Sequence, residues 1–351
     1  MKFLSLRLFL AATLTLLAAA MCTPAKNKET VKTETKSDTI PASIMGKVVF
    51  RIKNSDFFTN AKRKKINSVD EFRNYIPVYF YEKNGYFYIP NRLDNFIYSI
   101  NDSGKVIEKI SIPEETDIAH FYITGAGEKY ILNHKGLTVY DKENNKVNEN
   151  ARVIFITPDL SNDNLLVTSR YGDQDDNVEF ADKILERTDI RKIMREPLAE
   201  NVHYSDYYFD DQFLFEMSYD SLAGDGPKEG SIIFKKYDLH MLKLISENSV
   251  AMKCRNCFHM PNFLSERLVV ASNFSNKENP VNELFLFGEN GYKKFELTPP
   301  IKAKPLNDVM YIGRMPLNYN FSLEKNQKKL YSLATTETEV VVMEYELPEV
   351  R

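Results

Sequence analysis

The chain contains no tryptophan, and it has only three cysteines and five histidines among 351 residues. None of the histidines belongs to the H-E-x-x-H motif of zinc proteases, and neither a G-x-S-x-G nucleophile elbow nor a phosphate-binding P-loop occurs. These absences remove every local motif that would identify a particular enzyme class. They do not exclude an active site assembled from separate parts of the chain. The five histidines are His120, His134, His203, His240 and His259.

A strong charge of either sign is also missing. The formal net charge is −3, and it becomes −5 once Lys2 and Arg7 are removed with the N-terminal segment. The densest basic run extends from Ala61 to Lys65, and a run of this length is typical of a solvated loop. Because a mildly acidic body does not attract phosphate backbones, no nucleic-acid partner is expected.

Long apolar runs are absent except for one stretch, from Leu8 to Leu17, which contains two threonines. Basic residues precede this stretch and three alanines follow it, which is the pattern of a secretory signal peptide. The stretch is shorter than the ~20 residues that a membrane-spanning helix requires. The sequence therefore predicts a signal peptide over residues 1–21 and an exported protein.

Two processing sites compete at the end of this segment. Ala18-Ala19-Ala20 permits ordinary cleavage before Met21, which would leave a plain secreted protein. Alternatively, Ala19-Ala20-Met21-Cys22 resembles a bacterial lipobox, from which Met21 departs. We expect the second reading: a lipoprotein with an acyl (palmitate-type) anchor on Cys22 and the membrane as its partner. By resemblance to enterobacterial sorting, Thr23 in place of Asp implies the outer membrane.

The segment after Cys22 has few large apolar side chains and is rich in Lys, Glu, Thr and Pro. Such a segment cannot bury enough surface to offset its ordering entropy. We therefore predict a disordered tether over residues 22–45. A flexible chain of ~20 residues has a typical end-to-end distance of about 25 Å, which would hold the body clear of lipid headgroups.

The body, residues 46–351, is predicted to be all-β. Its 20 tyrosines and 23 phenylalanines favour pleated surfaces, and its apolar runs are short and broken by Asn, Asp and Gly. Residues 76–113 show the pattern most clearly, with four strands joined by tight turns, the first of them at Asn84-Gly85. Similar groups begin near residues 78, 121, 153, 207, 258 and 309. A four-stranded unit that recurs every ~40–50 residues is typical of β-propeller blades.

One blade-like stretch carries a family resemblance. It reads NGYFYI at residues 84–89 and FIYSINDSGK at residues 96–105. This rhythm resembles the six-bladed, NHL-like propellers of bacterial exported proteins, and the resemblance implies six blades of about four antiparallel strands. Without tryptophan the chain has no Trp-Asp signature of WD repeats and no Asp-box signature of sialidases. A β-sandwich and a solenoid are the alternative folds.

A propeller must also protect the edges of its first and last blades. The apolar run from Val48 to Ile52 precedes the first complete blade, and the run from Val340 to Tyr345 nearly ends the chain. We expect these two runs to pair in one blade and thereby to close the ring. The alternative is that the first run covers an outer surface.

The remaining two cysteines form the only local motif with chemical content, Cys254-Arg255-Asn256-Cys257. A c-type haem site would need His directly after the second cysteine, where Phe258 stands. A zinc site would need a second Cys or His pair, and a thioredoxin-like site would need an α/β unit. We expect a small structural disulfide between Cys254 and Cys257, and no cofactor.

Two acidic groups have the oxygen-rich composition that calcium prefers. Neither matches the D-x-D-x-D-G frame of a calcium-binding loop, so we interpret both as solvated loop tips and leave metal binding open. The first group is Asp173, Asp175, Asp176 and Asn177, and the second is Asp220, Asp225 and Glu229.

The function expected from the sequence is that of a membrane-anchored binding or scaffold protein, with a protein partner recognised by propeller loops. The alternative is a hydrolase or lyase with its active site at the mouth of the propeller channel. Catalytic side chains converging there from three or more blades would favour the enzyme. A mouth filled with Tyr, Phe and Lys would favour binding.

Overall fold

The computed structural model describes most of the chain from residue 42 onward, and residues 33–351 form one compact unit. No helix in this described part is long and apolar enough to cross a membrane. The described residues are 42–59, 75–77, 79–113, 118–133, 135–151, 153–159, 164–171, 175–180, 204–209, 212–219, 227–238, 241, 243–255, 259–273, 281–288, 291–301, 310–312, 315–317 and 321–348.

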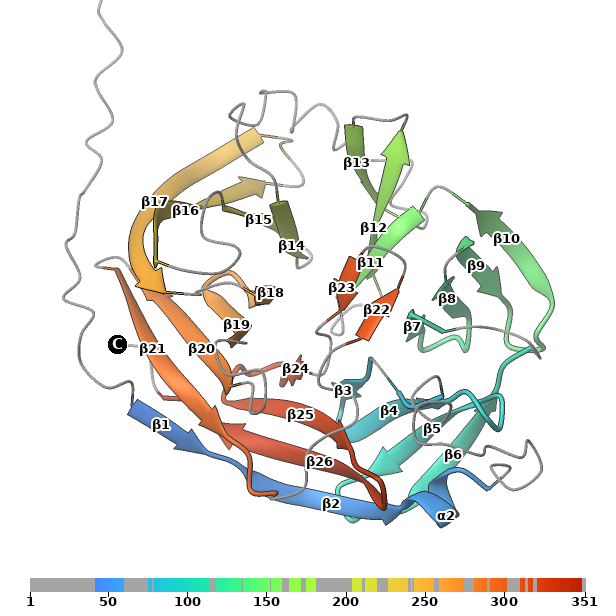
Figure 1. The fold of residues 1–351 in the computed structure, drawn as a ribbon. Helices are drawn as coiled ribbons and strands as arrows, with labels where there is room; N and C mark the ends of the chain where they lie inside the picture. The colour runs from blue at the N-terminus through green and yellow to red at the C-terminus, as the bar shows by residue number, and fades with distance from the viewer. Residues whose placement is uncertain are drawn as a thin grey trace, which may run out of the picture. The chain divides into compact units, whose positions relative to one another are not determined.

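Nearly all the described secondary structure is β, and most strands belong to antiparallel meanders (Figure 1). Three sheets are built from four consecutive strands each. The first contains β3 (Tyr81–Lys83), β4 (Tyr86–Asn91), β5 (Phe96–Asn101) and β6 (Val106–Ser111). The second contains β7 (His120–Ile123), β8 (Lys129–Asn133), β9 (Gly136–Tyr140) and β10 (Lys146–Asn150). The third contains β14 (Tyr204–Phe209), β15 (Phe213–Tyr219), β16 (Pro227–Asp238) and β17 (Lys243–Arg255).

Two further sheets include a strand from the N-terminal part of the chain. One contains β18 (His259–Ser265), β19 (Leu268–Asn273), β20 (Val281–Gly288) and β21 (Gly291–Thr298), with β1 (Ala42–Met45) at its edge. The other contains β24 (Phe321–Leu323), β25 (Lys329–Thr335) and β26 (Glu339–Glu346), with β2 (Lys47–Lys53) at its edge. The short helix α2 (Asn54–Phe57) follows β2.

The remaining strands form two smaller sheets. One has three strands, β11 (Val153–Asp159), β12 (Asn164–Tyr171) and β13 (Asp175–Phe180), and β11 contacts both β7 and β14. The other is the pair β22 (Met310–Ile312) and β23 (Met315–Leu317). The fold is a β-propeller, as predicted. The structure shows five blades with four or more strands, however, whereas the sequence predicted six.

The sequence misplaced one strand of the last repeat, and the reason lies in the ring closure. Residues 309–312 were expected to begin that repeat, but among the described strands Met310–Ile312 pairs with β23 and with no other. The innermost strand of the blade is instead β24, and its fourth strand is β2 from the other end of the chain. Because β2 completes the blade, the C-terminal region needs to supply only three strands.

The predicted closure itself is confirmed. β2 pairs antiparallel with β26, with Val48 opposite Met343 and Ile52 opposite Val340. An ion pair between Arg51 and Glu339 adds to the backbone ladder. Strands from near the two ends of the described residues therefore share one sheet, which removes an open edge.

The end of the predicted tether differs from expectation. Residues 42–45 were assigned to a disordered segment, but Ala42–Met45 forms β1, which pairs in parallel with β21. Gly46 then carries the chain from one blade to the next, and its N–H donates to the carbonyl of Thr298 at 2.9 Å. A Cβ atom at Gly46 would lie 2.8 Å from the Tyr345 ring, so this crossing requires glycine. Residues 42–53 thus bind the outer edges of two neighbouring blades (Figure 1).

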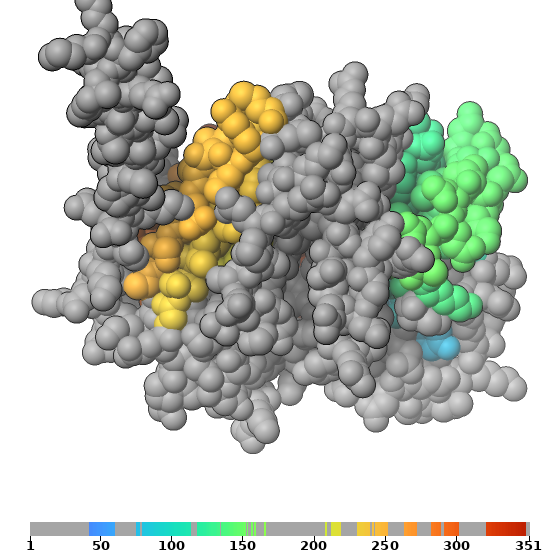
Figure 2. Space-filling view, turned by 90° about the horizontal axis from the view of Figure 1, so that it is seen from above, coloured from blue at the N-terminus to red at the C-terminus, as the bar shows by residue number. Residues whose placement is uncertain are grey.

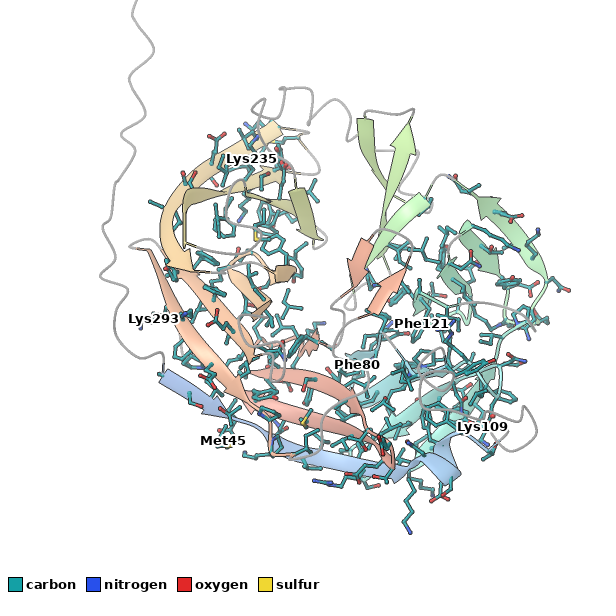
Figure 3. All side chains as sticks on the ribbon, in the orientation of Figure 1. Met45, Phe80, Lys109, Phe121, Lys235 and Lys293 are labelled. Carbon is teal, nitrogen blue, oxygen red and sulfur yellow. The ribbon has the colours of Figure 1, made fainter. Side chains whose placement is uncertain are left out.

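The core lies between sheets and consists largely of aromatic and branched side chains. Phe50 of β2, Phe87 of β4 and Tyr331 of β25 meet edge to face, with ring centroids 5.4 Å apart for Phe50–Phe87 and 5.0 Å for Phe87–Tyr331. Phe80, directly before β3, and Phe121, in β7, are labelled in Figure 3, and both are fully buried. Local turns follow the sequence, since Asn84 and Gly85 have φ of 55° and 81°, as the predicted hairpin requires.

Candidate functional site

Most of the residues singled out in the sequence lie beyond what the structure describes. Cys22 and Cys257 are outside the described residues. The backbone of Cys254 lies in β17 opposite Lys228, but its side chain is not described. The lipid anchor and the Cys254–Cys257 disulfide therefore stay predictions.

The acidic groups are placed in part, and one placement corrects the expectation of loop tips. Asp175, Asp176 and Asn177 belong to β13, where they pair with Tyr171, Arg170 and Ser169 of β12. Glu229 belongs to β16 opposite Lys253. Asp173, Asp220 and Asp225 are outside the described residues. Among the residues that the structure does describe, no group of three His, Cys, Asp or Glu side chains could hold a metal ion.

His120 is the one histidine of the five whose side-chain surroundings the structure describes. It lies in β7, is 3% exposed, and its ring stacks on Tyr79 with a centroid separation of 3.6 Å. Burial lowers the pKa of His120 to about 3, because the charged imidazolium would lose its hydration. His120 is therefore neutral at physiological pH and acts as a core residue. His134, His203 and His240 are outside the described residues, and only the backbone of His259, in β18, is described.

The inner strands β3 and β7 are packed with aromatic and lysine side chains. The Tyr81 hydroxyl accepts a hydrogen bond from the Ile123 N–H at 3.2 Å. Lys83 donates to the Tyr122 hydroxyl at 2.9 Å and lies 5.0 Å from that ring centroid. These contacts join the first strands of two neighbouring sheets.

A cleft lies between the sheet β14–β17 and the sheet β18–β21. Its volume is about 800 Å³, and strands β15, β16 and β17 contribute one side. The other side comes from β20, β21 and the turn between β18 and β19. Figure 2 shows the β16–β17 hairpin, in yellow and gold, at the surface of the molecule. A cleft of this size falls within the ~300–1,000 Å³ range of sites for small molecules.

The inner surface of the cleft is aromatic. Phe215 of β15 and Phe287 of β20 are buried, and Phe234 and Tyr292 are partly exposed beside them. The Phe234 and Phe287 rings meet across the two sheets with centroids 4.8 Å apart, and Tyr292 lies 5.8 Å from Phe287. This cluster joins the two sheets and leaves ring surface facing the cleft.

Charged side chains surround the aromatic surface. Lys235, Lys236, Arg267 and Lys293 line the cleft together with Glu216 and Glu266, so cations outnumber carboxylates. Figure 3 labels Lys235 and Lys293, which come from the two sheets that border the cleft. Glu216 is 1% exposed, and its carboxylate accepts hydrogen bonds from the Tyr237 hydroxyl at 2.8 Å and from Ser218 at 3.0 Å.

An irregularity in the pairing of β16 with β17 lies beside two adjacent lysines of this site. Consecutive side chains of a regular strand point to opposite faces. The pairing of β16 with β17 shifts register between Lys236 and Tyr237, where Ile245 of β17 is passed over, which marks a β-bulge in β17. Bulges redirect side chains and are frequent beside functional sites. Lys235 and Lys236 both line the cleft at this point.

The sequence did not predict this cleft. One local signal was available, the Lys235-Lys236 pair directly after the apolar run Ile232–Phe234. Arg267 and Lys293 are far from that pair in the sequence and carry no motif. Their approach depends on the packing of two neighbouring blades, which no local pattern reports.

Comparison with known proteins finds similarity of structure alone. No family model matches the chain, and no curated protein matches its sequence. Solved structures with a similar fold include a streptogramin B lyase, with 9% identity, a TM-score of 0.39, and coverage of 78% of this chain and 95% of that one. A protein of Bacteroides fragilis described as exported has 12% identity, a TM-score of 0.43, and coverage of 77% and 90%. A gluconolactonase of Xanthomonas campestris has 9% identity, a TM-score of 0.40, and coverage of 79% and 88%.

Proposed function

We propose that the protein is an exported, lipid-anchored binding protein whose ligand site is the cleft between the sheets β14–β17 and β18–β21. The observation that carries the proposal is the cleft itself, which has a volume of about 800 Å³. Its surface is aromatic, and charged side chains from two blades border it. Small-molecule sites combine apolar walls with a few convergent polar groups in this way. The signal-like segment before Cys22 and the polar segment after it support export and anchoring.

Anchoring through Cys22 leads to a direct prediction. The native protein is expected to begin at Cys22, to carry diacylglycerol and an acyl chain there, and to fractionate with the outer membrane. The Cys22→Ser variant is expected to lose the lipid mass and to leave the membrane fraction. Intact-mass analysis and membrane fractionation of both proteins measure these properties. A native chain that begins at Met21 without lipid would contradict the anchor.

Use of the cleft can be tested with two matched substitutions on β17. Ser246 lines the cleft and Ser249 does not, so Ser246→Trp places a large ring in the site whereas Ser249→Trp adds the same ring elsewhere on the strand. A library of small envelope metabolites is screened by thermal shift against the wild type and both variants. A ligand at one hundred times its Kd stabilises a protein by about 2.7 kcal/mol.

We expect ligands that stabilise the wild type and the Ser249→Trp protein but not the Ser246→Trp protein. Ligands that stabilise all three proteins equally would place the binding site outside the cleft. If no ligand stabilises the wild type, the proposed function is wrong.

A further inference from the structure

We infer that the ligand of the cleft is a small organic anion with a flat apolar body, such as an aromatic carboxylate. The inference rests on the proposed use of the cleft as a ligand site and specifies the chemistry of that ligand. It depends on two features that meet in one place. One is a group of cations without ion-pair partners, and the other is an aromatic surface between them.

Four cationic side chains line the cleft. In the described part of the chain, none of Lys235, Lys236, Arg267 and Lys293 forms an ion pair. The residue after Lys293 differs in this respect, since Lys294 lies 3.1 Å from Glu283 and forms an ion pair with it. Four cations brought together without anions repel one another, and a bound anion would relieve that repulsion.

The neighbouring carboxylates do not neutralise this group. Glu216 is buried and accepts hydrogen bonds from Tyr237 and Ser218, so its oxygens are held within the sheet β14–β17. Glu266 lies in an exposed turn at the margin of the cleft. The described charges that line the cleft are therefore four positive and two negative.

The aromatic surface defines the rest of the ligand. Phe234 and Tyr292 are partly exposed, and Phe287 lies between them with centroids 4.8 Å from Phe234 and 5.8 Å from Tyr292. Flat apolar groups pack on such rings in offset or edge-to-face arrangements. Lys236 already lies 3.7 Å from the Phe213 ring centroid, so cation and ring surfaces are in contact at the margin of the site. A charge and a flat body can thus be bound side by side.

Three probes separate the two features. 2-Naphthoate has both the flat body and the negative charge, 2-naphthamide has the body without the charge, and acetate has the charge without the body. Each is titrated by calorimetry into the purified full chain in matched detergent. We expect saturable binding of 2-naphthoate and no saturable binding of acetate. Binding of 2-naphthamide is expected to be at least about tenfold weaker than that of 2-naphthoate, because one partly screened charge contributes a binding free energy of this order.

Charge variants then locate the anion. Arg267→Glu and Lys293→Glu are each expected to weaken 2-naphthoate binding by about tenfold or more and to leave 2-naphthamide binding unchanged. Lys105→Glu, at an exposed lysine of the sheet β3–β6, makes the same change of charge and should alter neither probe. If a reversal variant fails to fold, Arg267→Gln keeps the test available, since it removes the charge from a surface turn without adding a new one.

The possible results separate the anion inference from the use of the cleft. The two naphthyl probes could bind equally, with no effect of the charge reversals but with loss of binding in the Ser246→Trp protein. That result would overturn the inference that the ligand is an anion and would leave the cleft as a ligand site. Equally tight binding of acetate would overturn the flat body. Absence of saturable 2-naphthoate binding to the wild type would overturn the inference as a whole.

Discussion

Removing residues 23–53 is expected to abolish folding of the propeller, whereas removing residues 23–41 should leave its melting temperature unchanged. The longer deletion removes β1 and β2, and the shorter one stops before the first described strand. Both deletions are made in the chain without its first 22 residues, and thermal unfolding is followed by circular dichroism.

The physical reason lies in what β2 covers. Phe50 is 5% exposed and packs on Phe87, and Val48 and Ile52 lie opposite Met343 and Val340. Burial of one such side chain contributes about 1.5–3 kcal/mol, so the strand contributes roughly 5 kcal/mol or more. The total stability of a typical domain is only about 5–15 kcal/mol. Loss of β2 would also expose the unpaired edge of β26.

An intermediate deletion separates the contributions of the two strands. Removing residues 23–45 takes away β1 alone, which pairs with β21 through four residues. We expect a partial decrease in melting temperature, because the blade keeps its other four strands. A protein lacking residues 23–53 that melts like the one lacking residues 23–41 would show that the closure contributes nothing to stability.

His120 is expected to make the protein sensitive to mild acid. Its pKa is about 3 in the folded protein, because of burial, against 6.5 for an unperturbed histidine. Between these values the unfolded chain binds the proton and the folded protein does not, so stability falls as pH decreases from 6.5 towards 3. The loss is about 1.4 kcal/mol per pH unit, or roughly 2.7 kcal/mol between pH 6.5 and pH 4.5.

The measurement compares the wild type with His120→Phe, which keeps an aromatic ring against Tyr79 but cannot be protonated. Urea unfolding at pH 7.0, 5.5 and 4.5 gives the free energy of unfolding of each protein. We expect the wild type to lose stability with decreasing pH more steeply than the variant. Other groups also titrate. Burial raises the pKa of Glu82, so the folded protein binds this proton more readily than the unfolded chain, and Glu82 adds stability as the pH decreases. The comparison cancels their contribution, and parallel pH profiles would contradict the role of His120.

Features that depend on neighbours in the chain were predictable. The Asn84-Gly85 turn follows from the ease with which Asn and Gly adopt positive φ, and the structure has both residues there. The short apolar runs between such turns predicted antiparallel strands and the propeller fold. The pairing of Val48–Ile52 with Val340–Tyr345 was predictable for a different reason, since two apolar edge strands at opposite ends of a ring must be covered.

Features that depend on which strands meet in space were not predictable from the sequence. The sequence pattern of Val309–Ile312 is that of a strand, but nothing local shows that β24 takes the first place in the blade and that β2 takes the fourth. Ala42–Met45 forms a strand only because the edge of β21 is available to pair with it in parallel.

By itself, the sequence determined that the body is built from short antiparallel strands, because turn residues set the limits of the strands locally. It also determined that the first and last apolar runs close one blade, because both edge strands must be covered. Only the tertiary structure decided the number of complete blades and the position of the cleft. Lys235 and Lys236 come from one blade, Arg267 and Lys293 from the next, and the aromatic surface between them exists only where Phe234 and Phe287 pack together. Packing between blades sets this arrangement, and side-chain contacts across a sheet interface leave no periodic trace in the chain.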